Sequence, residues 1–79
     1  MEWSLRELRV FATAVDTGSF TDAASALHTS QAAVSRTIAA LERQVGERVL
    51  RRTPRGCEPT PTGHQLLPAV RRLLAEADR

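Results

Sequence analysis

Residues 19–45 decide the fold, and they read SFTDAASAL (19–27), HTS (28–30) and QAAVSRTIAALERQV (31–45). The first and last of these segments have helical patterns, and only a short break separates them. In 31–45 one apolar face repeats at the spacing i, i+4, i+7, i+11, through Val34, Ile38, Leu41 and Val45. Two helices joined by so short a break predict a helix-turn-helix motif.

The opposite face of segment 31–45 is small, polar and cationic. A helix face that only meets water usually carries long side chains of both signs, whereas alanines leave room for another surface to come close. This face therefore suits a helix that lies in a groove of nucleic acid. Its residues are Ala32, Arg36, Ala39 and Arg43, with Gln31 and Ser35 on one flank.

The positive charge of the chain is concentrated in one segment. The formal net charge is +2, and all 11 basic residues are arginines. Six of them lie from Arg36 to Arg55, where Glu42 and Glu47 oppose them, so this segment carries +4. Residues 1–35 carry −2 and residues 56–79 carry no net charge. A basic segment that begins on the second helix of the motif is typical of a nucleic-acid-binding protein.

The composition argues against several other classes of protein. A chain of 79 residues with 42% hydrophobic residues predicts one globular domain, small enough that a second copy would help to bury its apolar surface. The sequence contains neither an apolar run of membrane-spanning length nor a signal-peptide pattern, so a cytoplasmic protein is expected. Cys57, His28 and His64 lack the spacing of a metal site. With no catalytic constellation or phosphate loop either, we expect no enzyme, metal or cofactor.

Capping signals bound the helices of the N-terminal half. Ser4-Leu-Arg-Glu7 is a capping box that starts a helix over 5–16. Trp3, just before it, is expected to anchor the chain on a neighbouring helix. The other caps are Ser19 for the second helix, in preference to Thr21, and Ser30 for the third, with stops at Gly18 and Gly46. The residues expected to face inward are Leu5, Leu8, Phe11, Ala12 and Val15 of the first helix and Ala23, Ala24 and Leu27 of the second.

A short basic hairpin is expected after the third helix. Thr53-Pro-Arg-Gly56 has the chemistry of a tight turn, and it separates two predicted strands, 49–52 and 57–58. Arg55 lies at the tip. Pro59 limits the second strand to an edge, because proline cannot donate a hydrogen bond to a ladder. A hairpin of this kind after a recognition helix is a wing.

The last segment predicts a long helix that begins at Thr60-Pro61, a cap followed by proline at the first helical position. It can run to residue 79, about 28 Å at 1.5 Å per residue, with a bend expected near Pro68. Its apolar stripe comprises Leu66, Leu67, Val70, Leu73, Leu74 and Ala77. We expect the start of the stripe to pack on the first two helices and Val70, Leu73, Leu74 and Ala77 to pack on a second copy. The alternative is that the whole stripe packs within one chain.

The sequence resembles the N-terminal DNA-binding region of LysR-type transcriptional regulators along essentially its whole length. The matching positions are Leu8 to Phe11, Gly18 to Thr21, Ala23-Ala24, Leu27-His28, Ser30-Gln31, Ser35-Arg36, Ile38, Leu41-Glu42, Gly46, Leu50, Arg52, Arg55-Gly56, Thr60-Pro61 and Gly63. The resemblance implies a mainly α fold with a small β-wing, divided into a winged helix-turn-helix DNA-binding domain (1–59) and a linker helix (60–79) that pairs two subunits. An effector-binding domain would follow, and it is absent from this chain.

The resemblance also implies roles for single residues. Positions matching Gln31, Ala32, Ser35 and Arg36 reach the major groove or its phosphates, the position matching Arg55 enters the minor groove, and the position matching Arg52 lies near the backbone. Two departures bear on these roles. Ala32 stands where the family often has proline, and Pro59 replaces an apolar strand residue, which weighs against the second wing strand. Thr62 stands where alanine is common, without consequence.

The chemistry of these side chains supports DNA contact and leaves some roles open. Gln31 can pair with adenine or bond the backbone at the helix start, and Arg36 can pair with guanine or grip a phosphate. The hydroxyls of Ser35 and Thr21 suit phosphates, although surface or cap roles would also fit them. Arg55 on a wing tip suits a narrow A/T-rich minor groove. The remaining arginines, Arg43, Arg48 and Arg51, could equally contact DNA or pair with Glu42 and Glu47.

These features predict sequence-specific binding to double-stranded DNA by a homodimer. Two recognition helices related by a twofold axis require an inverted repeat, with half-sites about 34–36 Å apart or a multiple of that distance. A small-molecule effector would act only through the absent domain, and no membrane partner is expected. The alternative function is a winged-helix module for protein interaction or dimerisation that does not bind DNA.

Overall fold

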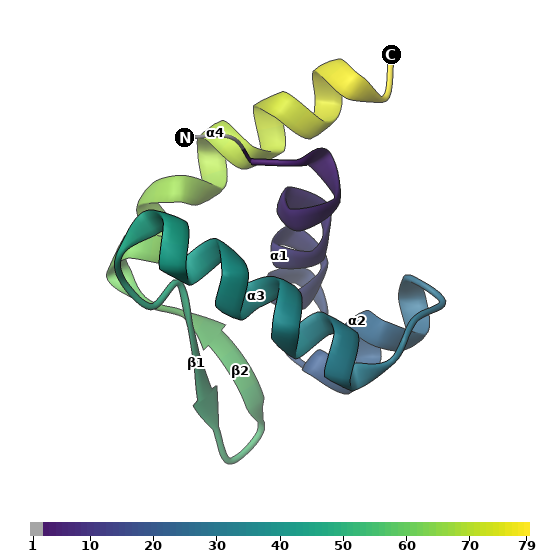
Figure 1. Ribbon diagram of the computed structural model, residues 1–79, viewed down its shortest axis with the longest axis vertical. Coiled ribbons are helices and arrows are strands. Elements are labelled where there is room, and N and C mark those ends of the chain that lie inside the picture. Colours follow the sequence, from purple (N-terminus) through teal and green to yellow (C-terminus); the bar gives the residue numbers. More distant parts are fainter. Residues whose placement is uncertain (1–2) are drawn as a thin grey trace.

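The computed structural model describes residues 3–79 and shows four helices and one hairpin. In chain order the elements are α1 (Leu5–Thr17), α2 (Phe20–Ala26), α3 (Gln31–Val45), β1 (Leu50–Thr53), β2 (Gly56–Pro59) and α4 (Pro61–Ala77). Helix α1 is central, α3 crosses it, the hairpin projects at one end of the domain and α4 lies at the other (Figure 1). The predicted mainly α fold with a small β-wing is confirmed.

Local side-chain chemistry starts each helix where the sequence predicts. The Ser4 hydroxyl accepts from the Glu7 N–H while the Glu7 carboxylate accepts from the Ser4 N–H, which completes the capping box. Ser19, Ser30 and Thr60 cap α2, α3 and α4 in the same manner, each accepting a backbone N–H three residues on. Ser19 rather than Thr21 is therefore the cap of α2, as predicted.

The core forms where α1 meets the other helices, and it corrects part of the predicted burial. Leu8, Phe11 and Ala12 are buried as expected, but Val10 and Ala14 are buried too, whereas Leu5 is 47% exposed. The reason is that α1 packs against α2, α3 and α4, so it buries more than one stripe, while Leu5 lies in its first turn beyond their cover. The partly buried hydrophobic residues that pack against this core are Trp3, Val15, Leu27, Val45, Leu66, Leu67 and Leu74.

The hairpin forms, with a first strand of the predicted length that begins one residue later, at Leu50, and a second strand that is longer than predicted and includes Pro59. Leu50 pairs with Pro59 and Thr53 with Gly56 in an antiparallel register. Because the Thr60 N–H donates to the Val49 carbonyl at 3.1 Å, the next pair in the ladder lacks hydrogen bonds and the Pro59 nitrogen faces away from β1. The second wing strand therefore forms despite Pro59, which had weighed against it, and it is an edge strand as expected.

The hairpin is joined to the turn between α1 and α2 by close backbone contact. The Cys57 N–H donates to the Gly18 carbonyl oxygen at 2.9 Å. Gly56 has a φ of 143°, and a Cβ at this position would lie 2.0 Å from the same oxygen. Only glycine fits here, so the start of β2, next to the wing tip, is fixed to the helix-turn-helix rather than free to swing.

Helix α4 continues without interruption through Pro68 and is attached to α1 by two ion pairs. The guanidinium of Arg71 binds the Asp16 carboxylate through both terminal nitrogens, at 2.9 and 3.4 Å. Arg9 binds Asp78 in the same way, at 3.0 and 3.3 Å. These hydrogen bonds raise the pKa of both arginines. Between residues 3 and 79, no helix has both the length and the hydropathy to cross a membrane.

The structure corrects the predicted role of one α4 residue. Val70 is only 1% exposed and belongs to the core of its own chain, so it is not available to a second copy. Leu73, by contrast, is 50% exposed, and Leu74 is partly buried beside the core. The turn of α4 after Val70 is the first to carry an exposed leucine.

Candidate nucleic-acid interface

The outer face of α3 is open to solvent along its length. Gln31, Ala32, Arg36 and Arg43 are exposed, and Ser35 and Ala39 are half-buried. On the inner face Val34 and Leu41 are fully buried and Ile38 is 3% exposed, so the two faces predicted from the sequence are confirmed. The helix holds its apolar side in the core while its small and cationic side can meet a partner.

The N-terminal turn of α3 is electropositive. Ser30 caps one of its free backbone N–H groups, and its first turn carries no acidic residue. Unpaired N–H groups at a helix start favour anions. Thr21 is exposed in the first turn of α2, which packs against α3, and it adds a free-standing hydroxyl group to the surface. Phosphate oxygens would be suitable partners for both groups.

Arg52 of β1 reaches across to the helix-turn-helix. Its guanidinium carbon lies 4.1 Å from the centroid of the Phe20 ring, and its terminal nitrogen donates to the Ser35 hydroxyl at 3.4 Å. The sequence predicted Arg52 as a DNA contact only. The structure adds an intramolecular role, in which Arg52 links the wing to α2 and α3.

The arginines of the basic segment differ in what they bind within the chain. Arg48 pairs with Glu42 at 3.4 Å, and Arg51 pairs across the hairpin with Glu58. Arg36, Arg43 and Arg55 make no ion pair within residues 3–79. Arg55 is exposed in the two-residue turn at the tip of the hairpin, as predicted. Apart from Arg52, which binds Phe20 and Ser35, the arginines of this segment without an ion pair thus lie on α3 and at the wing tip.

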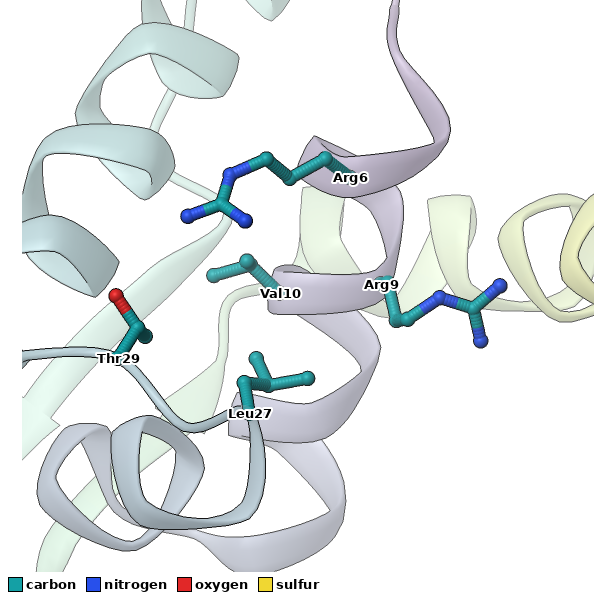
Figure 2. A pocket seen from close by; sticks show the side chains of 5 residues that line it. All are labelled: Arg6, Arg9, Val10, Leu27 and Thr29. Carbon is teal, nitrogen blue, oxygen red and sulfur yellow. The ribbon is translucent and has the colours of Figure 1, made fainter.

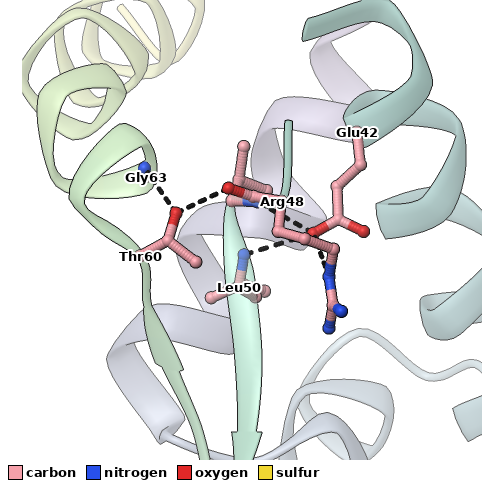
Figure 3. A network of polar contacts seen from close by, with 6 residues as sticks. Glu42, Arg48, Leu50, Thr60 and Gly63 are labelled. Carbon is pink, nitrogen blue, oxygen red and sulfur yellow. Dashed lines mark hydrogen bonds and ion pairs between the residues drawn. The ribbon is translucent and has the colours of Figure 1, made fainter. Parts of the chain in front are cut away.

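A polar network fixes the wing relative to α3 (Figure 3). The Glu42 carboxylate, on a side chain 17% exposed, accepts from the backbone N–H groups of Val49 at 2.8 Å and Leu50 at 3.3 Å. On the other side of β1, the Thr60 hydroxyl donates to the Arg48 carbonyl at 2.6 Å and accepts from the Gly63 N–H. One side chain of α3 and the cap of α4 therefore hold the two sides of the strand's start.

The structure brings most of the predicted site residues to one region. Gln31, Ala32, Ser35 and Arg36 share the exposed side of α3, Arg52 adjoins it through Ser35, and Arg55 extends from the same hairpin. The C-terminal half of α4, whose residues include Leu73, Leu74 and Ala77, lies at the opposite end of the domain from the wing tip (Figure 1). A groove-binding surface and a pairing surface can therefore operate without obstructing each other.

Sequence reasoning missed two residues that support this region. Phe20 is 8% exposed beneath Arg52, and Glu42 bridges α3 to β1. The predicted hairpin placed Arg52 on a strand, but no local pattern connects that strand to the first residue of α2. For Glu42 there was no local signal, because it lies on the flank of α3 that also carries the polar residues Gln31 and Ser35.

Comparison with known proteins identifies the family. Residues 5–64 match the family described as bacterial regulatory helix-turn-helix protein, lysR family. The HTH-type transcriptional regulator BlaA of Streptomyces cacaoi is 46% identical over 70 residues, which cover 89% of this chain. The chain spans only 22% of the length of BlaA.

Two similar solved structures are complexes with DNA. The crystal structure of a CbnR_DBD-DNA complex matches 98% of this chain and 88% of the CbnR chain, with a TM-score of 0.91 and 38% identity. That of a BenM_DBD/catB site 1 DNA complex matches 96% of this chain and 85% of the BenM chain, with a TM-score of 0.90 and 38% identity. The chain therefore belongs to the lysR family of bacterial regulatory helix-turn-helix proteins, and its fold is the winged helix-turn-helix DNA-binding domain of a LysR-type transcriptional regulator.

Proposed function

We propose that this chain binds specific double-stranded DNA sites as a homodimer and regulates transcription from them. One observation carries the proposal: α3 keeps a small, cationic face open to solvent, and the hairpin beside it exposes an unpaired arginine at its tip. The CbnR and BenM complexes with DNA support it. We assign DNA binding to residues 1–59 and dimerisation to residues 60–79.

In the proposed complex, α3 lies in the major groove. Gln31 at the helix start can form two hydrogen bonds with adenine, and Ala32 beside it lets the backbone approach closely. Arg36 reads guanine or grips a phosphate, and these two roles predict different base dependence. Ser35 and Thr21 bind phosphates and fix the position of the helix without reading sequence.

The wing extends the contact to the adjoining minor groove. Arg55, free at the tip, inserts where an A/T-rich sequence narrows the groove and strengthens its negative potential. Arg52 remains near the backbone, with its position set by Phe20 and Ser35. Arg48 and Arg51 contribute less, because each already pairs with a carboxylate.

A second copy of the chain would bind through α4. Leu73, Leu74 and Ala77 form its contact stripe, without Val70. Twofold symmetry then requires an inverted repeat, with half-sites spaced by about one helical turn of DNA or a multiple of it. An effector would act through a further domain, consistent with the greater length of BlaA. Bacterial chromosomal DNA is cytoplasmic, so this function places the protein in the cytoplasm.

The proposal is tested by fluorescence anisotropy with a duplex that carries an A/T-rich inverted repeat, titrated at several salt concentrations. Arg36→Ala and Arg55→Ala should each weaken binding about tenfold, since each removes a charge-assisted contact. Arg51→Ala, which removes a paired arginine from the same hairpin, serves as the matched control and should weaken binding less than either. If Arg36 reads a guanine, Arg36→Ala should weaken binding only to sites that contain this guanine. If Arg36 binds a phosphate, the same substitution should weaken binding to every site.

The two substitutions also separate DNA binding from the alternative function. Tight binding with a steep salt dependence, reduced by both substitutions, supports the proposed mechanism. If the unaltered chain fails to bind any duplex even at low salt, the domain is instead a winged-helix module for protein interaction.

A further inference from the structure

Arg6, in the first turn of α1, lies beside α3 although the two are far apart in the sequence. Two surface hollows meet at its side chain. The first is lined by Arg6, Arg9, Val10, Leu27 and Thr29 (Figure 2), and the second by Arg6, Glu7, Ala33, Arg36, Thr37 and Ala40. Arg6 thus adjoins both the turn before α3 and the flank of α3 that carries Arg36.

The flank of α3 beside Arg6 is opposite the flank that faces the wing. On the wing side, Ser35 accepts from Arg52 and Glu42 binds the start of β1. On the other side, Gln44 donates to the Glu7 carboxylate at 3.3 Å, which holds that flank against the start of α1. The exposed face of α3 therefore lies between the wing on one side and the start of α1 on the other.

The arginines on α1 differ in what their guanidinium groups bind. In Figure 2 the side chains of Arg6 and Arg9 leave the helix in opposite directions, and Arg9 points toward α4, where it binds Asp78. Within residues 3–79, Arg6 is in no ion pair, and the nearby Glu7 carboxylate binds Ser4 and Gln44 instead. Arg6 is exposed, so its charge can meet a partner from outside the chain.

We propose that Arg6 binds a DNA phosphate on the side of the major groove opposite the wing. This inference rests on the proposed function and deepens it. The major groove is about 12 Å wide and is bounded by two phosphate backbones, so a helix of about 10–12 Å diameter fills it. Two cations, one on each flank of α3, would then face the two phosphate backbones of the DNA. Arg52 of the wing faces one backbone, and Arg6 binds the other.

A solvated arginine would give a different result from a phosphate-binding one. A phosphate contact carries no sequence information, so its loss weakens binding to specific and nonspecific duplexes by the same factor. Binding without this contact also releases one fewer counterion, so the slope of log K against log salt becomes shallower by about 0.9. A solvated side chain would change neither the affinity nor the slope beyond the small effect of net charge.

The test compares Arg6→Gln with Arg72→Gln, which removes the same charge from an exposed position on α4. Affinity for an inverted-repeat duplex and for a scrambled duplex is measured by fluorescence anisotropy at four salt concentrations. Arg6→Gln should weaken binding to both by about tenfold and lower the slope by about 0.9, while Arg72→Gln should leave the slope unchanged. Arg6→Lys, which keeps the charge, should restore most of the slope.

A second arm locates the phosphate. Duplexes with single methylphosphonate substitutions, which are uncharged, are scanned along the groove edge opposite the wing. At one position the substitution should weaken the unaltered chain but not Arg6→Gln, because the two changes remove the same contact. Equal losses for Arg6→Gln and Arg72→Gln, or no such position, would overturn the role of Arg6. If the unaltered chain does not bind DNA at all, the proposed function itself fails.

Discussion

The guanidinium of Arg52 stacks over the ring of Phe20, with 4.1 Å between the guanidinium carbon and the ring centroid. Phe20 is the first residue of α2 and Arg52 is in β1. One cation–π contact thus joins the elements that precede and follow α3 in the sequence. The same guanidinium also donates to Ser35 of α3. The position of the wing is thus set by an arginine that the sequence resemblance assigned to DNA alone.

Phe20→Leu should keep an apolar side chain at this position, somewhat smaller than the original, but remove the aromatic face. We expect a loss of about 1 kcal/mol in the free energy of unfolding and weaker DNA binding, because Arg52 is no longer held beside Ser35. Phe11→Leu is the matched control, since Phe11 is fully buried in the core and has no arginine over its ring. It should reduce stability in urea denaturation without weakening the binding of the folded protein. Equal effects of both variants on binding would contradict this role of Phe20.

Glu42→Ala should destabilise the domain by about 2–4 kcal/mol, because it leaves two backbone N–H groups at the start of β1 without their acceptor. The midpoint of urea denaturation measures this loss. Glu47→Ala removes a nearby, exposed carboxylate that accepts, within residues 3–79, from the Thr62 hydroxyl alone, so it should cost less than about 0.5 kcal/mol. If the two variants were equally stable, Glu42 would not fix the wing.

Gly56→Ala should be among the most destabilising single-methyl changes in the chain, at about 3 kcal/mol. Alanine would have to adopt a φ of 143°, which is strained for a residue with a side chain, and its Cβ would clash with the Gly18 carbonyl. Gly46→Ala separates these causes, since Gly46 has a φ of 88° but no atom within 4 Å of the added Cβ. It should cost only about 1 kcal/mol in thermal denaturation. A smaller loss at Gly56 than at Gly46 would show that the hairpin shifts freely.

Leu73→Glu should separate the proposed dimer into monomers. A charged side chain in an apolar contact stripe removes its burial and adds a desolvation cost. Leu5→Glu makes the same change at the other exposed large hydrophobic residue of the described chain, on α1. Sedimentation equilibrium should show loss of the dimer only for Leu73→Glu, with weaker binding to the inverted repeat. A dimer that survives this substitution would move the interface away from α4.

The Cys57 thiol provides a prediction about pH. Burial raises the pKa of this thiol, and the positive charge of Arg52 lowers it by a smaller amount. Because the folded pKa lies above the unfolded value of about 8.5, the contribution to stability is complete below that value. It is lost as the pH rises toward the folded pKa. Free energies of unfolding from pH 7 to pH 10 should therefore decline more in the unaltered chain than in Cys57→Ala.

Local chemistry made the helix boundaries predictable from the sequence. Ser4 with Glu7, and Ser19, Ser30 and Thr60, each act on backbone groups within three residues, so their effect does not depend on the rest of the fold. The two faces of α3 were predictable for a similar reason, because helical periodicity alone sorts its residues. The DNA-binding roles of those exposed residues stay predictions.

The errors arose where tertiary contacts decide. Leu5 was expected inside, but no helix covers the first turn of α1 on that side. Pro59 fits a strand because the ladder places its nitrogen on the outer edge, a result of register that composition does not contain. Val70 appeared free for a partner because the sequence does not show how far α1 extends beneath α4. Each correction depends on a neighbour distant in the chain.

The pairs Arg9–Asp78 and Arg71–Asp16 connect the two ends of α1 to α4, so the helix and the DNA-binding core turn as one body. In the proposed dimer, a change in the angle at which α4 meets the second copy would then also move α3. Both pairs are exposed, and dissolved ions screen them as they screen phosphate contacts. If the proposed dimer binds DNA, ionic strength would therefore act on it twice, by weakening each contact with DNA and by loosening the contacts that set the distance between its two recognition helices.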